Sequence, residues 1–448
     1  MIGIGLDIPT SAILGRAGTN NVPNLTFNWV AEGDSITIGL GGTPAWPFAA
    51  LGTMPGATPS TPGTNTPTST SLTGGATVNL NDIATSGISA LTIRDNYSTR
   101  GGAAFDGAKN INIFSIMAGT NTSGVNDTTP QQKYLILRTI LRKARVTGYQ
   151  RKVIGTITAR DDNPAFWTGT LVPLNSYIAA YWNSDLDCDG LINFSGDARF
   201  GSAAAADDLT YYGADKLHPN VAGEAAMGSI AKSVMISALQ GAGTRVNAPA
   251  TWSIFDYGTS YLTLSNANRT VAWSTTGFTD AAFRGFIGKR SGKWYWETVF
   301  DNIGSAIVGI INENFDATLQ VNNLQGTVNA MGYGAASAYG TQNIRGNSVV
   351  LASMSGASVN GDVIRHALDL DNGSYWMAIN GGNWNNSASN NPSTNVGGAS
   401  TSVLTANGTG GLIYPAGEIH TNGGQVTSRF ALAEQSFSVP SGFKALDQ

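Results

Sequence analysis

The pattern of apolar residues changes near residue 243, and this change points to two differently built domains. Before it, apolar runs alternate with helical spacing. The run Ile111–Met117 is apolar on both faces, as in a strand buried inside a parallel sheet. A helix signal with a capping-box pattern begins at Thr129-Pro130 and stops at Gly148, and Val153–Ile157 reads as the next strand. Strand, helix and strand in this order predict an α/β domain with a parallel sheet.

Beyond residue 250 no helical period is persuasive. Short strand-like segments separated by Gly and Asn take its place, among them Lys293–Val299, Ile307–Ile311 and Ser374–Ile379. Many short strands with turns between them are typical of an antiparallel sandwich. The second half of the chain is therefore predicted to be an all-β domain.

With 448 residues the chain is long enough for two domains of roughly 200 residues each. The last helix of the α/β domain is expected from about Val221 to Leu239. Residues 55–75 are rich in Pro, Thr and Gly without any period, so we predict a loop there. The predicted organisation is an N-terminal arm at 1–25, an α/β domain at 26–242, a linker at 243–250 and a β-sandwich at 251–448.

Composition excludes several classes of protein. The net charge of −4 does not indicate a basic surface for nucleic acid. The sequence contains no run of 18 apolar residues, so a membrane span is not predicted. Cys188 is the single cysteine, so an intrachain disulfide and a cysteine-based zinc cluster are both excluded. The first residues lack a basic segment and include Asp7, which makes a poor signal peptide. We expect a delivery route other than ordinary secretion.

Two short motifs in the first domain supply the parts of a nucleophilic site. Gly33-Asp34-Ser35 follows an apolar run, and Asp215 precedes His218 by three residues near the start of the last predicted helix. A serine hydroxyl attacks well only when an imidazole removes its proton, and the imidazole needs a carboxylate to fix its tautomer. His218 is the only histidine in this half of the chain. Each motif alone is common and more often structural.

Together these motifs resemble the first and last blocks of the SGNH, or GDSL-type, hydrolases over about residues 26–240. The resemblance implies a three-layer, flavodoxin-like parallel sheet with helices on both faces. It implies that Ser35 is the nucleophile, His218 the base and Asp215 its orienting acid. It also implies an oxyanion hole made by the N–H groups of Ser35 and Gly87 and the Asn121 side chain. Thr122 departs from the aspartate that usually follows that asparagine.

A second signal lies at residues 185–190. Asp185, Asp187 and Asp189 match the opening of a calcium loop, but its twelfth position is Gly196 rather than an acid. We favour an acidic turn leading into a strand, keep calcium as the alternative, and expect no other metal and no cofactor. Four basic residues of the helix after Pro130 are interpreted as a solvated face: Arg138, Arg142, Lys143 and Arg145.

Residues 251–448 resemble a SPRY domain, a β-sandwich known mostly as an interaction module. The stretches that carry the resemblance are Gly292–Glu297, Ile307–Ile310, Gly361–Ile364, Ala367–Gly373, Asn380–Gly382, Leu412–Ala416 and Phe437–Phe443. Five aromatic side chains could stack on sugars, but core packing is the favoured interpretation: Trp294, Tyr295, Trp296, Trp376 and Trp384. His366 and His420 are assigned no role.

The arrangement of the two domains resembles a phage tail-associated esterase. That resemblance implies removal of O-acetyl groups from a bacterial surface polysaccharide by a virion protein acting outside the cell. Its partners would be the acylated glycan and other virion proteins, held through the arm or the SPRY-like domain, in a homo-oligomer. Two alternatives stay open. One is a lipid esterase or thioesterase, and the other is a structural or receptor-binding virion protein with a vestigial site.

Overall fold

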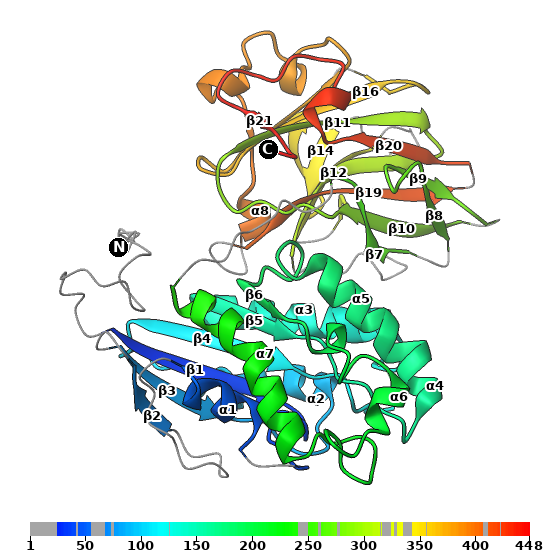
Figure 1. Ribbon diagram of the computed structural model, residues 1–448. Helices are drawn as coiled ribbons and strands as arrows, with labels where there is room; N and C mark the ends of the chain where they lie inside the picture. Colours follow the sequence, from blue (N-terminus) through cyan, green and yellow to red (C-terminus); the bar gives the residue numbers. More distant parts are fainter. Residues whose placement is uncertain are drawn as a thin grey trace. The chain divides into compact units, whose positions relative to one another are not determined.

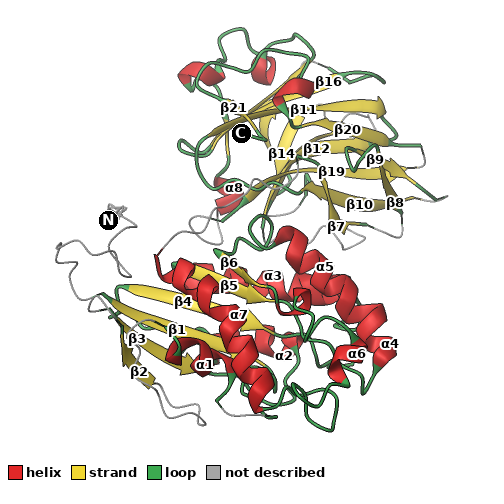
Figure 2. Cartoon of the chain, viewed as in Figure 1, coloured by secondary structure: helices red, strands yellow, loops and turns green. Residues whose placement is uncertain are grey.

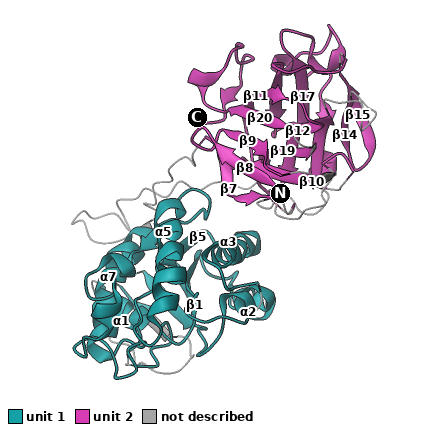
Figure 3. Cartoon of the chain, turned by 90° about the vertical axis from the view of Figure 1, so that its right-hand side faces the viewer, with its two compact units in different colours: residues 1–246 teal, residues 247–448 magenta. Residues whose placement is uncertain are grey.

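The computed structural model divides the chain into two compact units, residues 1–246 and 247–448 (Figure 3). The structure describes residues 25–41, 44–54, 68–72, 76–124, 126–240, 250–258, 261–275, 278–313, 315, 324–326, 329–334, 343–354, 356–405, 411–421 and 423–448. The predicted arm, apart from residue 25, and the predicted linker, apart from residue 250, lie outside these ranges. No helix of the described residues is long and apolar enough to cross a membrane.

The first unit is built on a six-stranded sheet with the order β2-β3-β1-β4-β5-β6 (Figure 1). β3, β1, β4, β5 and β6 run parallel to one another, whereas β2 pairs with β3 antiparallel at the edge. The chain order reverses at β1, which makes its carboxyl end the switch point where α/β sheets bind ligands. The strands are β1 Thr26–Gly33, β2 Thr68–Ser71, β3 Thr77–Asp82, β4 Ile111–Met117, β5 Arg151–Gly155 and β6 Gly190–Ile192.

Helices cover both faces of this sheet, as predicted. α1 and α7 pack together on one face, and α2, α3 and α5 pack on the other (Figure 3). The helices are α1 Trp46–Gly52, α2 Ala90–Asp95, α3 Pro130–Thr147, α4 Pro164–Phe166, α5 Val172–Tyr181, α6 Ala203–Ala206 and α7 Val221–Gln240. Short helical turns lie at η1 Tyr97–Thr99, η2 Trp167–Leu171, which is π-helical, and η3 Phe194–Gly196.

Local signals set the ends of α3. The Thr129 hydroxyl accepts the Gln132 backbone N–H, the Gln132 side chain accepts the Thr129 backbone N–H, and Pro130 opens the helix. Gly148 ends it at φ 115°, a left-handed conformation that glycine adopts without steric cost. Each of these features was predicted from the sequence.

The loop predicted at residues 55–75 was wrong at Thr68–Ser71. These four residues form β2, which pairs with β3 from Leu80 down to Thr77. Hydrogen bonding to an open sheet edge makes a strand of a Thr/Ser segment that has no apolar alternation of its own. Residues 55–67 and 73–75 lie outside the described part of the chain.

The second unit is a sandwich of two antiparallel sheets (Figure 2). One sheet has the order β15-β14-β13-β12-β19-β10-β7 and the other β18-β17-β16-β11-β20-β9-β8, while β21 adds to β11 in parallel. The first sheet contains β7 Trp252–Tyr257, β10 Phe278–Gly285, β12 Ala306–Asn312, β13 Ala330–Gly334, β14 Asn343–Gly346, β15 Val349–Ser353 and β19 Ile413–Thr421. The second contains β8 Leu262–Ser265, β9 Thr270–Trp273, β11 Lys293–Asn302, β16 Val363–Asp369, β17 Ser374–Ile379, β18 Ala399–Ser400, β20 Gln425–Arg429 and β21 Lys444–Ala445.

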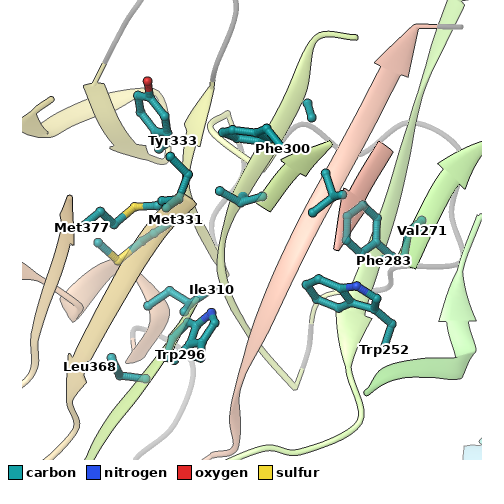
Figure 4. Close-up of a cluster of buried hydrophobic side chains, with 14 of the residues drawn as sticks. Trp252, Val271, Phe283, Trp296, Phe300, Ile310, Met331, Tyr333, Leu368 and Met377 are labelled. Atoms are coloured by element: carbon teal, nitrogen blue, oxygen red, sulfur yellow. The ribbon is translucent and has the colours of Figure 1, made fainter. Parts of the chain in front are cut away.

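The core of the sandwich is aromatic and aliphatic (Figure 4). Tyr295, Trp296 and Trp376 are buried, as the core-packing interpretation predicted, whereas Trp294 and Trp384 are only partly buried. Besides the 3-10 turns η5 Trp384–Asn386, η6 Pro392–Thr394 and η7 Leu432–Glu434, the short helix α8 Ser402–Thr405 interrupts the all-β pattern where no helix was predicted. At four residues it is too short to leave a helical period in the sequence.

Candidate active site

Ser35 lies just beyond the carboxyl end of β1, in a tight turn. The backbone N–H of Leu40 donates to the Ser35 carbonyl at 3.0 Å, and that of Ile38 donates to the Asp34 carbonyl at 3.2 Å. Glycine is required at position 33, because a Cβ there would lie 2.1 Å from the Thr37 hydroxyl and 2.6 Å from the Met117 carbonyl oxygen. With glycine at position 33, the chain can turn sharply after β1 while it passes close to both Met117 of β4 and Thr37. This turn presents Ser35 at the sheet edge.

His218 approaches Ser35 from the loop before α7. Its Nε2 lies 2.8 Å from Ser35 Oγ, and its Nδ1 lies 2.7 Å from Asp215 Oδ2. The other carboxylate oxygen, Asp215 Oδ1, accepts the backbone N–H groups of Leu217 and His218 at 3.1 and 3.0 Å. The structure thus brings the three residues predicted from the two sequence motifs into one hydrogen-bonded chain.

The loop is shaped by neighbours of the histidine. Lys216 adopts φ 55°, which lets Asp215 fold back onto the His218 ring. Asn220 rather than His218 caps α7, because its side-chain oxygen accepts the N–H groups of Ala222 and Gly223. His218 therefore does not serve as the helix cap.

The carboxyl groups at the site have different environments. Burial raises the pKa of Asp215, but hydrogen bonds from the His218 side chain and from two backbone N–H groups outweigh it, so the pKa lies below its ordinary value. Burial raises the pKa of Asp34, although the Ile36 N–H and Thr120 partly oppose it. Asp215 is thus held as a carboxylate beside the imidazole, whereas burial of Asp34 disfavours the charged form of its side chain.

Gly87 and Asn121, the predicted oxyanion donors, lie in loops that are tied to each other. Asn121 Nδ2 donates to the Ile88 carbonyl at 3.1 Å, and Ile88 follows Gly87 directly. Gly87 adopts φ 74° in an exposed turn, and a Cβ there would meet nothing within 4 Å. The Gly87 backbone is therefore open to solvent on that side.

Sequence reasoning missed two cations that hold the loop before Asn121. Lys133 Nζ donates to the Asn121 carbonyl at 2.8 Å, and Arg160 Nη1 donates to the Thr120 carbonyl at 3.0 Å. Burial lowers the pKa of Lys133 to about 8. Both residues act through backbone oxygens, so no short motif marks them.

The three aspartates at 185–189 do not converge on a common point. Asp185 Oδ2 receives the Tyr134 hydroxyl at 2.9 Å and Arg138 Nη1 at 3.1 Å, Asp187 pairs with Lys152, and Asp189 accepts the Lys152 backbone N–H. Among the described residues no group of three or more His, Cys, Asp or Glu side chains has metal-binding geometry. The printed contacts of these carboxylates are those of an acidic turn paired with side chains and a backbone N–H of other segments.

The solvated face predicted for α3 was wrong for three of its four residues. Arg138, Arg142 and Arg145 retain 8%, 15% and 13% side-chain exposure and pair with Asp185 or Asp187. Their cationic groups offset the carboxylates of the acidic turn, which lies some forty residues further along the chain. Cys188, in the same turn, is buried and forms no disulfide.

No protein-family model matches the chain, and no curated protein matches it. Among solved structures, a member of the lipolytic protein G-D-S-L family from Veillonella parvula is 19% identical, covering 46% of this chain and 97% of its own, with a TM-score of 0.35. The SPRY domain of human HERC1 is 16% identical, covering 40% and 96%, with a TM-score of 0.29. A human SPRY domain is 12% identical, covering 38% and 94%, with a TM-score of 0.28. The chain is similar in part to both kinds of structure, and at these TM-scores the likeness decides nothing about activity.

Proposed function

We propose that the first unit is a serine ester hydrolase. The observation that carries the proposal is the unbroken chain of contacts from Ser35 Oγ through His218 to Asp215, with distances of 2.8 and 2.7 Å. Nucleophile, base and orienting acid within hydrogen-bond reach of one another form the working geometry of acyl transfer. The triad sits at the switch point of the sheet, where α/β enzymes bind their substrates.

The chemistry follows from the tautomer that this geometry favours. With its Nδ1–H donated to Asp215, His218 presents an unprotonated Nε2 to the Ser35 hydroxyl. As Oγ bonds to the ester carbonyl carbon, its proton passes to Nε2 and the carbonyl oxygen becomes an oxyanion. When that intermediate collapses, the C–O bond to the alcohol breaks and the imidazolium protonates the leaving alcohol. Water, deprotonated by His218, then hydrolyses the acyl-serine and releases the acid.

Asp215 and the oxyanion donors have complementary parts in this scheme. The Asp215 carboxylate stabilises the imidazolium that forms in each half-reaction. The N–H groups of Ser35 and Gly87 and the amide of Asn121 would stabilise the negative oxygen. In the resting structure the Asn121 amide donates one hydrogen to Ile88, which leaves its second hydrogen for an oxyanion.

For the substrate we propose short acyl esters, above all O-acetyl groups on a bacterial surface polysaccharide. A cavity of about 290 Å³ lies beside α5, but its lining includes none of the predicted catalytic or oxyanion residues, so it is not assigned as the substrate site. Its lining residues carry no charge and include several amide and hydroxyl groups. The lining residues are Trp167, Val172, Asn175, Ser176, Ala179, Asn193, Ser195, Gly196 and Gly201.

The biological setting belongs to the same proposal. We infer a phage particle acting at a bacterial surface, with the SPRY-like unit docking to other virion proteins or to glycan. The resemblance of the domain arrangement to tail-associated esterases supports this setting. The low content of charged residues, 12% of the chain, supports it as well.

Hydrolysis of p-nitrophenyl acetate, butyrate and octanoate by wild type and by Ser35→Ala tests the reaction. We expect acetate turnover that disappears in Ser35→Ala and falls with chain length in wild type. Preference for octanoate would move the assignment to a lipid esterase or thioesterase. Equal background rates for two folded proteins would leave a structural or receptor-binding protein. Acetate release from acetylated and from chemically deacetylated polysaccharide then tests the glycan.

A further inference from the structure

Arg100, which follows the turn η1, joins the two segments that hold the nucleophile and a predicted oxyanion donor. On one side, its Nη2 lies 2.6 Å from Glu32 Oε1 and its Nε lies 3.1 Å from Glu32 Oε2. On the other, Nη2 donates to the Ile83 carbonyl at 2.5 Å and Nη1 to the Thr85 hydroxyl at 3.0 Å. One guanidinium therefore connects the end of β1 with residues 83–85, and we refer to Arg100, Glu32, Ile83 and Thr85 as the Arg100 clamp.

The Glu32 side of the clamp lies three residues before Ser35. Its side chain has no exposure to solvent, and Oε1 also accepts the Gly33 backbone N–H at 3.1 Å. Burial raises the pKa of Glu32, and the contact with Arg100 opposes that rise. A planar guanidinium satisfies both carboxylate oxygens at once, which a lysine cannot do.

The loop side of the clamp lies two residues before Gly87. Thr85 donates its backbone N–H to the Gly33 carbonyl at 3.1 Å, and Ile83 donates its own to the Ala31 carbonyl at 2.9 Å. Beyond these bonds, Thr85, Ser86 and Gly87 are exposed. Ile88 then accepts the Asn121 amide. The clamp fixes the start of this exposed turn relative to β1.

We propose that Arg100 is a positioning residue that sets the distance between Ser35 and the oxyanion donors Gly87 and Asn121. It does not touch the reacting atoms, but it defines where the Gly87 turn stands when the acyl group arrives. This inference rests on the proposed ester hydrolysis. Misplacing a catalytic group by about 1 Å costs on the order of 100-fold in rate, as does loss of one oxyanion donor.

The test compares Arg100→Ala, Arg100→Lys and Thr85→Val with wild type on p-nitrophenyl acetate. Arg94→Met is the matched control, because Arg94 lies in the preceding helix α2 and its guanidinium, among the described residues, pairs only with its exposed neighbour Asp95. We expect kcat of Arg100→Ala to fall about 100-fold with KM within about 2-fold, because the defect lies in the transition state. Millimolar guanidinium chloride should restore part of that loss, and Arg100→Lys should lose less than Arg100→Ala.

Thr85→Val keeps the Glu32–Arg100 pair and removes one loop contact, so it reports on positioning even where Arg100→Ala does not fold. We expect about a 10-fold fall in its kcat. If wild type is active and Arg100→Ala has the wild-type kcat, the positioning role alone is overturned. Where Arg100→Ala does not fold, a wild-type kcat in Thr85→Val has the same meaning. An inert, folded wild type overturns the proposed hydrolysis, and the positioning role with it. The positioning role is also overturned if the activity lost in Arg100→Ala is not restored by guanidinium and falls in step with thermal unfolding.

Discussion

The edge of the parallel sheet and the interior of the β-sandwich each hold a histidine whose Nδ1 lies 2.7 Å from an oxygen. In the first unit that oxygen is Asp215 Oδ2, and in the second it is the Tyr375 hydroxyl. Beyond this contact the two regions differ. His218 presents Nε2 to Ser35, whereas the ring of His366 is stacked on Trp296 with ring centroids 4.8 Å apart.

The surroundings of the two rings decide which histidine can work as a base. His366 is fully buried, its Nε2 has no hydrogen-bond partner among the described residues, and burial lowers its pKa to about 3. A ring so placed stays neutral and contributes packing. His218 retains partial exposure and faces a carboxylate that can stabilise its protonated form. Surroundings, not residue type, separate the candidate base from the core side chain.

The largest effect is expected when each of the two histidines is replaced by glutamine. We expect His218→Gln to lower kcat on p-nitrophenyl acetate by about 10⁴-fold or more, since it removes the base. Its free energy of unfolding should change by less than about 1 kcal/mol, the usual range for a partly exposed ion pair. His366→Gln should keep kcat and lose about 1–3 kcal/mol of stability through lost packing. Loss of activity in both variants, with both folded, would break the comparison.

A smaller effect is expected from Asp215→Asn. The amide keeps the shape of the side chain but can donate to His218, which favours the wrong tautomer, so kcat should fall about 10²- to 10⁴-fold. Asp208→Asn is the matched control, because among the described residues the exposed Asp208 carboxylate bonds only to the backbone N–H and the side chain of Thr210. Steady-state kinetics on p-nitrophenyl acetate measures both. An Asp215→Asn rate within about 3-fold of the Asp208→Asn rate would argue against the orienting role.

The sequence allowed much of the site to be predicted because its signals are local. Asp215 and His218 share one turn, and Thr129, Pro130 and Gly148 mark the ends of α3 through their own backbone preferences. These interactions span a few residues, so a short pattern records them completely.

Contacts between distant segments leave no such record. Glu32 and Arg100 are 68 positions apart, and each alone reads as an ordinary surface charge. Arg138 was predicted to be solvated because the carboxylate that permits its burial, Asp185, lies 47 positions away. β2 likewise depends on the open edge of β3 rather than on its own residues. Whether a polar group is buried is decided by its partner, which only the fold supplies.

The smallest effect, and the one that sharpens the contrast between the two histidines most directly, is the pH dependence of stability. The pKa of His366 is depressed from about 6.5 in the unfolded chain to about 3 in the folded one. Below about pH 6.5 the unfolded state therefore binds a proton that the folded state does not, and the free energy of unfolding falls by up to about 1.4 kcal/mol per pH unit as pH decreases. Above pH 6.5 both states carry a neutral ring, and this contribution is constant.

Urea unfolding of wild type and His366→Gln between pH 4 and pH 8 isolates this group, because the other titrating residues are common to both proteins. The stability difference in favour of wild type should be constant above about pH 6.5 and should shrink steadily below it, since only wild type loses stability through this ring. A difference between wild type and His366→Gln that does not vary with pH would mean that the His366 ring gains its proton in the folded sandwich.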